Sequence, residues 1–215
     1  MYRKYIKRII DFSLSFIALI ILSPIFLIVS ILVKIKLGTP VIFKQERPGL
    51  NEKVFTLYKF RTMNDKKDEN GNLLSDSERL TKFGKMLRST SLDELPELIN
   101  ILKGDMSIVG PRPLLTRYME YYTDEERKRH SVRPGLTGLA QSNGRNLLTW
   151  EERFKLDIEY VNNITFSRDI NILFKTIKKL FKTNEILTGD ENIIKDLDVE
   201  RGSINEVRKS KHQLI

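Results

Sequence analysis

The chain has 215 residues, contains no cysteine and carries a formal net charge of +9. This length suffices for one domain with a hydrophobic core, or for a modest domain with an attachment device. The lack of cysteine excludes a disulfide framework, a thiolate nucleophile and a cysteine-based zinc site. The positive charge predicts an anionic partner, which would be nucleic acid, acidic lipid or a phosphorylated substrate.

An apolar segment without any charge runs from Phe12 to Val33. A straight helix over it would be about 33 Å long, which is enough for a bilayer core of about 30 Å. Because Pro24 in its middle lacks an N–H and its ring clashes with the preceding turn, we expect a kink there. Ser23 is expected to donate to the Leu19 carbonyl and so repair part of the damage.

Basic residues flank this segment on both sides, and they favour the cytoplasmic side of a membrane. The pattern therefore predicts a re-entrant helix-break-helix over residues 1–36, broken at Ser23 and Pro24, with both termini cytoplasmic. A single spanning helix is the alternative. The flanking residues are Arg3, Lys4, Lys7 and Arg8 before the segment and Lys34, Lys36 and Lys44 after it.

The remaining elements predict an α+β fold that is mainly helical, with a catalytic domain at the membrane surface over residues 37–184. Residues 39–63 predict a small β-hairpin around the turn signal Arg47-Pro48-Gly49. A polar loop follows over 64–76. Two helices are expected over 77–104 and one each over 115–132 and 148–161, with Gly- or Pro-rich loops between them.

Residues 167–182 predict an amphipathic helix, which either faces the protein core or lies on anionic lipid. The sequence does not separate these two possibilities. Residues 185–215 are expected to form a polar C-terminal tail. The apolar stripe of the helix comprises Ile170, Leu173, Phe174, Ile177, Leu180 and Phe181.

The chemistry available to the chain is narrow, because its only histidines are His130 and His212. His130 lies in a run of charged residues, where a solvated helix face is the expected position. No Ser-His-Asp triad, zinc site or phosphate-binding glycine loop can be assembled. Any covalent chemistry would therefore need a carboxylate as the nucleophile.

The stretch SLDELPEL, residues 91–98, offers two adjacent carboxylates, Asp93 and Glu94. A capping box, with Ser91 as the cap and Glu94 returning the bond, is the simplest interpretation. At a helix start, however, carboxylates are also kept ionised, and adjacent carboxylates suit Mg²⁺ together with substrate phosphates. Five cations in loops or at element ends favour a phosphate site around the pair; they are Lys59, Arg61, Arg88, Arg112 and Arg145.

Six stretches, in order, resemble the bacterial sugar transferases known as monotopic phosphoglycosyl transferases. They are the basic N-terminus, the apolar segment with its Ser-Pro, FKQERPG (43–49), LYKFRTM (57–63), the block from Arg88 to Pro113, and RPGLTGLAQ (133–141). The likeness covers about residues 1–185. The chain looks like a minimal member, without the extra spanning helices of larger relatives and closest to enzymes that start bacterial N-glycan assembly.

The resemblance implies transfer of a phospho-sugar from a UDP-sugar to polyprenol (undecaprenyl) phosphate, with release of UMP. The implied donor carries an N-acetylated amino or diamino sugar, and the reaction is the first membrane step of glycoconjugate assembly. Mg²⁺ is the implied cofactor. The implied location is the cytoplasmic face of the bacterial inner membrane, with inner-membrane lipids and downstream glycosyltransferases as partners.

The resemblance also implies roles for individual residues. Asp93 would be the nucleophile that forms a covalent phospho-sugar intermediate, and Glu94 would help to bind the metal or to activate the acceptor, both being metal ligands. Asp157 would be a supporting carboxylate in the substrate site, with a structural salt bridge as the alternative. The implied phosphate or nucleotide ligands are Lys59, Arg88, Arg112 and Arg145.

Two other functions stay open at this point. A membrane-anchored basic protein that binds nucleic acid or acidic lipid would explain the charge, although no nucleic-acid-binding module is recognisable. A metal-dependent glycosyltransferase that moves the sugar alone would release UDP instead of UMP.

Overall fold

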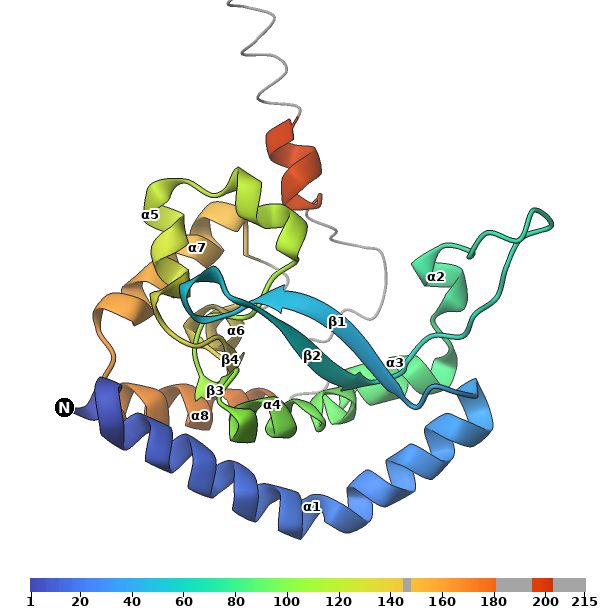
Figure 1. Cartoon of the computed structure of the whole chain (residues 1–215), viewed down its shortest axis with the longest axis horizontal. Helices are drawn as coiled ribbons and strands as arrows, with labels where there is room; N and C mark the ends of the chain where they lie inside the picture. The colour runs from blue at the N-terminus through green and yellow to red at the C-terminus, as the bar shows by residue number, and fades with distance from the viewer. Residues whose placement is uncertain (145–147, 181–194, 203–215) are drawn as a thin grey trace, which may run out of the picture.

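The computed structural model describes residues 1–144, 148–180 and 195–202. A long helix, α1 (Lys7–Leu37), follows a short π-helical turn over Tyr2–Ile6. It continues through Pro24, and Figure 1 shows it bent near its middle. Among the described residues, Tyr2–Leu37 is the one helix that is long and apolar enough to cross a membrane. The predicted break is thus a bend inside one helix, and the re-entrant topology stays a prediction.

The bend has a local hydrogen bond that compensates for the proline. The Ser23 hydroxyl donates to the Ile20 carbonyl at 2.8 Å, instead of to Leu19 as predicted from the sequence. Ile20 is the residue whose carbonyl Pro24, four positions later, leaves without a backbone donor. The hydroxyl of Ser23 therefore replaces the missing N–H.

Polar contacts fasten the N-terminal half of α1 to the rest of the domain. Arg8 donates to two main-chain carbonyls in the last turn of α4 (Glu97–Lys103), at 2.6 and 2.8 Å. Asp11 is buried and accepts from the Ser107 hydroxyl at 2.6 Å and the Ile108 N–H at 3.1 Å. The C-terminal half is held by an apolar cluster of Val29, Val33, Leu37, Phe60 and Leu87.

The predicted hairpin is confirmed: β1 (Ile42–Pro48) and β2 (Val54–Phe60) pair antiparallel, from Ile42 opposite Phe60 to Pro48 opposite Val54. The chain reverses through a 3₁₀ turn over Leu50–Glu52. The turn therefore comes later than the sequence signal indicated, because Arg47 and Pro48 still belong to the strand. In Figure 1 the hairpin crosses above α1, α4 and α8 (Phe166–Leu180).

β3 (Ser107–Val109) and β4 (Gly135–Thr137) form a short parallel pair. Loops were expected at both places from the sequence. The pair joins two of the glycine- and proline-rich motifs of the sequence. A Cβ on Gly135 would lie 2.1 Å from the main-chain nitrogen of Gly110, so only glycine permits this approach of the two backbones.

The helices after the hairpin are shorter than expected. Residues 76–104 form α2 (Asp76–Arg79), α3 (Lys82–Ser89) and α4, with a 3₁₀ turn over Leu92–Glu94 between the last two. The helix expected over 115–132 is broken, because Thr123 and Glu126 form a capping box that starts a new helix. The elements there are 3₁₀ turns over Thr116–Tyr121 and Lys128–Ser131 around α5 (Asp124–Arg127), followed by α6 (Leu139–Asn143).

The solvated position expected for His130 is wrong. Its side chain is buried against the ring of Tyr122. Burial, with Arg129 and Arg127 nearby, lowers the pKa of the imidazole to about 3, so His130 is neutral.

The helix predicted over 148–161 is confirmed as α7 (Trp150–Asn162). For α8 the sequence left open whether the helix faces the protein core or lies on lipid, and its side chains divide between a buried and an exposed face. Ile172 is fully buried against Val109 and Tyr160. Phe174 and Ile177, by contrast, are 69% and 50% exposed. One face of α8 therefore belongs to the core, while part of the predicted stripe stays uncovered by protein.

Part of the expected C-terminal tail packs on the domain. Residues 197–202 form a helix on the side opposite α1 (Figure 1). Leu197 is fully buried with Trp150 and Phe154, and Arg201 makes a two-pronged ion pair with Glu126 at 2.7 Å. Arg117 pairs with Asp196 and Asp198, and the Trp150 indole donates to the Lys195 carbonyl, so polar contacts also anchor this segment.

Candidate active site

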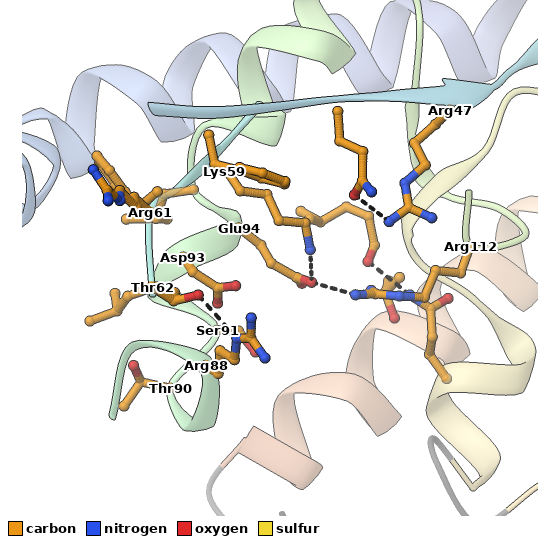
Figure 2. A pocket seen from close by; sticks show the side chains of 18 of the residues that line it. Arg47, Lys59, Arg61, Thr62, Arg88, Thr90, Ser91, Asp93, Glu94 and Arg112 are labelled. Atoms are coloured by element: carbon orange, nitrogen blue, oxygen red, sulfur yellow. Dashed lines mark hydrogen bonds and ion pairs between the residues drawn. The ribbon is translucent and has the colours of Figure 1, made fainter. Parts of the chain in front are cut away.

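A cavity of about 1110 Å³ is lined by residues of the hairpin and of several helices. Its polar part contains the side chains singled out from the sequence, and Figure 2 shows several of them converging there. Its apolar part reaches α1 through Ala18 and Leu22. The cavity thus extends from charged groups to the helix that is apolar enough for a membrane.

The acidic pair enters this cavity on a short 3₁₀ turn. Ser91 precedes it at φ 56°, a left-handed conformation that serine rarely adopts and that is common at functional sites. The Ser91 side chain makes no capping hydrogen bond. The Glu94 carboxylate accepts from Lys59 and Arg112 instead of from the Ser91 N–H. The capping-box interpretation is therefore wrong: this backbone presents Asp93 and Glu94 to the cavity (Figure 2).

Asp93 is a desolvated carboxylate without a partner. It is 7% exposed, and no described residue gives it a hydrogen bond or an ion pair within bonding distance. Burial and the neighbouring Glu94 raise its pKa to about 6, although Lys59, Arg112 and Arg88 act in the opposite direction. A carboxylate in this state is ionised at neutral pH and poorly solvated, which suits a nucleophile.

Glu94, in contrast, is firmly held. One of its carboxylate oxygens accepts from Lys59 Nζ at 2.8 Å and from Arg112 Nη2 at 2.7 Å. Burial opposes ionisation, but the charges of Arg112 and Lys59 prevail and lower the pKa of Glu94 below its usual range. The two adjacent carboxylates therefore differ: both line the cavity, but Glu94 binds two cations, while Asp93 has no partner among the described residues.

Sequence reasoning missed Glu97. It is 2% exposed and lies 3.1 Å from Lys59 Nζ, so one lysine serves two carboxylates. Burial and Glu94 raise the pKa of Glu97 above its usual range. The spacing of three residues from Glu94 was the available signal, because residues three apart lie on the same side of a helix.

The predicted cations have different positions. Arg88 donates to the Thr62 hydroxyl at 3.1 Å and lies near Asp93 in Figure 2. Arg61 donates to the carbonyls of Met63 and Thr39 and pairs with Asp65, so it ties down main chain instead of facing Asp93. Arg145 lies outside the described residues.

Asp157 forms a buried salt bridge, which was the alternative left open from the sequence. Its carboxylate accepts from Arg129 Nε at 3.1 Å and from Nη2 at 2.8 Å. The same Nη2 also donates to the Arg112 carbonyl at 2.7 Å. Asp157 thereby supports the main chain that carries Arg112.

The arrangement has the parts that phosphoryl chemistry needs. An unpartnered carboxylate lies beside Arg88, while Arg112 and Lys59 remain at the edge of the same cavity. Fixed cations stabilise the charge that develops on phosphate oxygens during transfer, and they do so most strongly in a cavity that excludes water.

The family model described as "Bacterial sugar transferase" matches residues 2–183. The chain belongs to this family. The resemblance seen in the sequence motifs is thereby confirmed. Membrane topology and the roles of individual residues stay predictions.

The chain is similar to several bacterial sugar transferases. The chain is 51% identical over 181 residues to the "Uncharacterized sugar transferase EpsL" of Bacillus subtilis, covering 84% of this chain and 90% of that protein. It is 35% identical over 188 residues to a "UDP-glucose:undecaprenyl-phosphate glucose-1-phosphate transferase" of Caulobacter vibrioides, covering 83% and 70%. It is 39% identical to an "Undecaprenyl-phosphate galactose phosphotransferase" of Salmonella typhimurium, but spans only 41% of that protein.

Proposed function

We propose that this sugar transferase moves a phospho-sugar from a UDP-sugar to polyprenol phosphate, with Asp93 as a covalent nucleophile. The relatives' names support the reaction class, since they pair UDP-sugar or sugar phosphate with undecaprenyl phosphate. The observation that carries the residue assignment is the contrast within the acidic pair. Glu94 is bound by two cations, while no described residue binds Asp93.

The proposed reaction has two half-reactions. An oxygen of Asp93 forms a bond to the sugar-bearing phosphorus, and the bond from that phosphorus to the bridging oxygen breaks. UMP leaves with the bridging oxygen and its electron pair. An oxygen of polyprenol phosphate then attacks the same phosphorus, which releases the Asp93 carboxylate and gives polyprenol-diphosphate-sugar. Soluble donor and lipid acceptor thus use one site in turn.

The cations have defined tasks in this scheme. Arg88 lies beside Asp93 and would neutralise the phosphoryl group under attack. Lys59 and Arg112, held by Glu94, would stabilise charge on the departing phosphate. The ion pairs fix these side chains before substrate binds, so little reorganisation is needed during the reaction.

Mg²⁺ is proposed as the cofactor. Among the described residues, no group of three or more acidic, histidine or cysteine side chains is arranged to hold a metal. Mg²⁺ usually takes one or two carboxylates together with substrate phosphates, and Asp93 with the second oxygen of Glu94 fits that smaller demand. When bound, the ion would neutralise the donor diphosphate. Loss of activity with EDTA, restored by Mg²⁺, is the expected result.

For location, we propose the cytoplasmic face of the inner membrane, with α1 entering one leaflet and both termini cytoplasmic. The bend at Pro24, the basic residues on both flanks and the exposed apolar side chains of α8 support this topology. Protease-sensitive tags on both ends should be cleaved only from the cytoplasmic side. An N-terminal tag cleaved from outside would contradict the re-entrant arrangement and favour a spanning helix.

The donor sugar is proposed from the motif resemblance as an N-acetylated amino or diamino sugar, used in N-glycan assembly or another glycoconjugate pathway. UDP-glucose and UDP-galactose belong in the same test, because relatives' names specify these sugars. The donor panel should be run with undecaprenyl phosphate, and release of UMP instead of UDP would exclude transfer of the sugar alone.

The deciding experiment uses purified protein in nanodiscs with Mg²⁺ and each donor, but without lipid acceptor. We expect about one equivalent of UMP per active site and an intact-mass increase equal to one phospho-sugar, mapped to Asp93. Asp93→Asn should abolish both while keeping the protein in the membrane. UMP that appears only after undecaprenyl phosphate is added would contradict the covalent intermediate.

A further inference from the structure

One half-buried cation of the cavity has no task in the scheme above. Arg47, at the end of β1, lines the cavity and belongs to the FKQERPG motif. Its Nη2 donates to the side-chain oxygen of Gln45 at 2.6 Å, while its Nε is buried and has no hydrogen-bond partner among the described residues. No described carboxylate lies within ion-pair distance of it.

The surroundings of Arg47 make its charge costly. Burial and the nearby charge of Arg112 lower its pKa to about 10, although the charge of Glu97 acts in the opposite direction. A guanidinium that contributed only to folding would be expected to pair with a carboxylate or with main-chain carbonyls, as Arg61 and Arg129 do here. Arg47 instead has one neutral partner, which orients it and leaves its charge uncompensated.

Its position separates it from the attacking carboxylate. Figure 2 shows Arg47 and Arg112 on one side of the Glu94 carboxylate, with Asp93 and Arg88 on the other. The cavity therefore has two cationic ends, joined by the ion pairs of Glu94 with Lys59 and Arg112. The first end is the one proposed above to serve the phosphorus attacked by Asp93, and the second carries the positive charges of Arg47 and Arg112.

We propose that Arg47, oriented by Gln45 and assisted by Arg112, binds a second phosphate group, one that is not attacked by Asp93. This inference rests on the proposed function, which supplies two such groups in turn: the phosphate of the departing UMP and the phosphate of the lipid acceptor. Both present an anionic oxygen to a guanidinium fork, which is the geometry that arginine binds best.

The test begins with binding, so that it does not depend on turnover. UMP is titrated by calorimetry into wild-type protein in nanodiscs and into Arg47→Gln, Arg47→Lys and Arg168→Gln. Arg168 pairs with Glu159 on the surface, so its variant removes the same charge outside the cavity. Undecaprenyl phosphate is then varied in steady-state assays of the same four proteins with the donor found active.

Loss of a charge-assisted hydrogen bond should weaken the bound phosphate about tenfold or more. If UMP binding falls by that factor in Arg47→Gln, less in Arg47→Lys and not in Arg168→Gln, the second phosphate is that of the nucleotide. If UMP binding is unchanged but KM for undecaprenyl phosphate rises about tenfold, it is that of the lipid. If the UMP affinity and the KM for undecaprenyl phosphate of Arg47→Gln both stay within about twofold of the wild-type values, the proposal is overturned.

Thermal unfolding without ligand separates this role from a structural one. Because the charge of Arg47 is half-buried and has no ion-pair partner among the described residues, Arg47→Gln should unfold at the same or a higher temperature than wild type. A lower unfolding temperature together with equal loss of both ligands would assign Arg47 to folding and overturn the proposal. If no donor reacts in wild type, the proposed function fails, while UMP titration still decides whether Arg47 binds phosphate.

Discussion

Arg129 donates to the main-chain carbonyl of Arg112 at 2.7 Å while it is buried in an ion pair with Asp157. Arg112 in turn holds Glu94. A carboxylate on α7 is thereby connected to the acidic turn through two arginines. The relationship makes Arg129 and Asp157 positioning residues, since neither has a place among the groups proposed to touch phosphate.

The Asp157–Arg129 pair gives a test in which stability and activity separate. Asp157→Asn leaves a buried, uncompensated guanidinium and should cost about 3–5 kcal/mol of unfolding free energy. The double variant Asp157→Leu with Arg129→Met should recover most of that stability, because an apolar pair often replaces a buried ion pair without loss. Its KM for the UDP-sugar should nevertheless stay raised, since the Arg112 carbonyl has lost its donor. Wild-type kinetics in the double variant would show that the pair serves folding alone.

The pH dependence of the first half-reaction should report Asp93. Its pKa is raised to about 6 by burial and by Glu94, and only the ionised carboxylate attacks phosphorus. The rate of the UMP burst should therefore be constant above about pH 7 and fall tenfold per pH unit well below 6. Rapid-quench measurement between pH 5 and 8 tests this directly. A rate that stays level down to pH 5 would exclude Asp93 as the titrating nucleophile.

The same group predicts a stability gain for Asp93→Asn. Since the folded-state pKa of Asp93 exceeds its unfolded value of 3.8, the folded protein binds the proton more tightly, and stability falls as pH rises from about 4 to about 6. At pH 7.5 the neutral amide removes this cost, worth at most about 3 kcal/mol. The gain should vanish near pH 3.5. Glu46→Gln, at an exposed position on β1 outside the cavity, is the matched control that removes the same charge.

Glu94→Gln should change both the rate and its pH dependence. Removing a negative neighbour of Asp93 takes away one cause of its raised pKa, so the acid limb of the rate profile should move to lower pH. The plateau rate should fall about tenfold or more, because Lys59 and Arg112 lose the charge that fixes them. An unchanged acid limb would show that Glu94 does not set the pKa of Asp93.

The Ser23 hydroxyl offers a test of the bend in α1. Ser23→Ala leaves the Ile20 carbonyl without a donor next to Pro24, which is costly in an apolar medium. We expect a lower unfolding temperature in nanodiscs for Ser23→Ala alone. In a Pro24→Ala background, Ser23→Ala should lower the unfolding temperature little, because alanine restores the backbone donor to the Ile20 carbonyl. Equal losses for Ser23→Ala in both backgrounds would contradict the link between the two residues.

The sequence by itself determined the features that depend on local pattern. The uncharged run Phe12–Val33 and the proline within it predicted a long apolar helix with a kink, since hydropathy and the missing N–H act locally. Apolar, β-branched and aromatic runs on both sides of the turn signal Arg47-Pro48-Gly49 predicted the hairpin. The adjacent carboxylates and the isolated arginines predicted a charged site from residue type and spacing, and their roles stay predictions.

Tertiary structure alone decided which charge compensates which. Lys59 on β2 meets Glu94 and Glu97, and Arg129 reaches the Arg112 carbonyl, across 17 to 38 residues of chain. The same holds for the parallel pairing of Ser107–Val109 with Gly135–Thr137 and for the unpaired state of Arg47. Ion pairing and pKa depend on burial and on distances of a few ångströms, and a linear pattern specifies neither. For that reason the sequence supplied the acidic pair, and the fold decided that Glu94 binds two cations while Asp93 has no partner among the described residues.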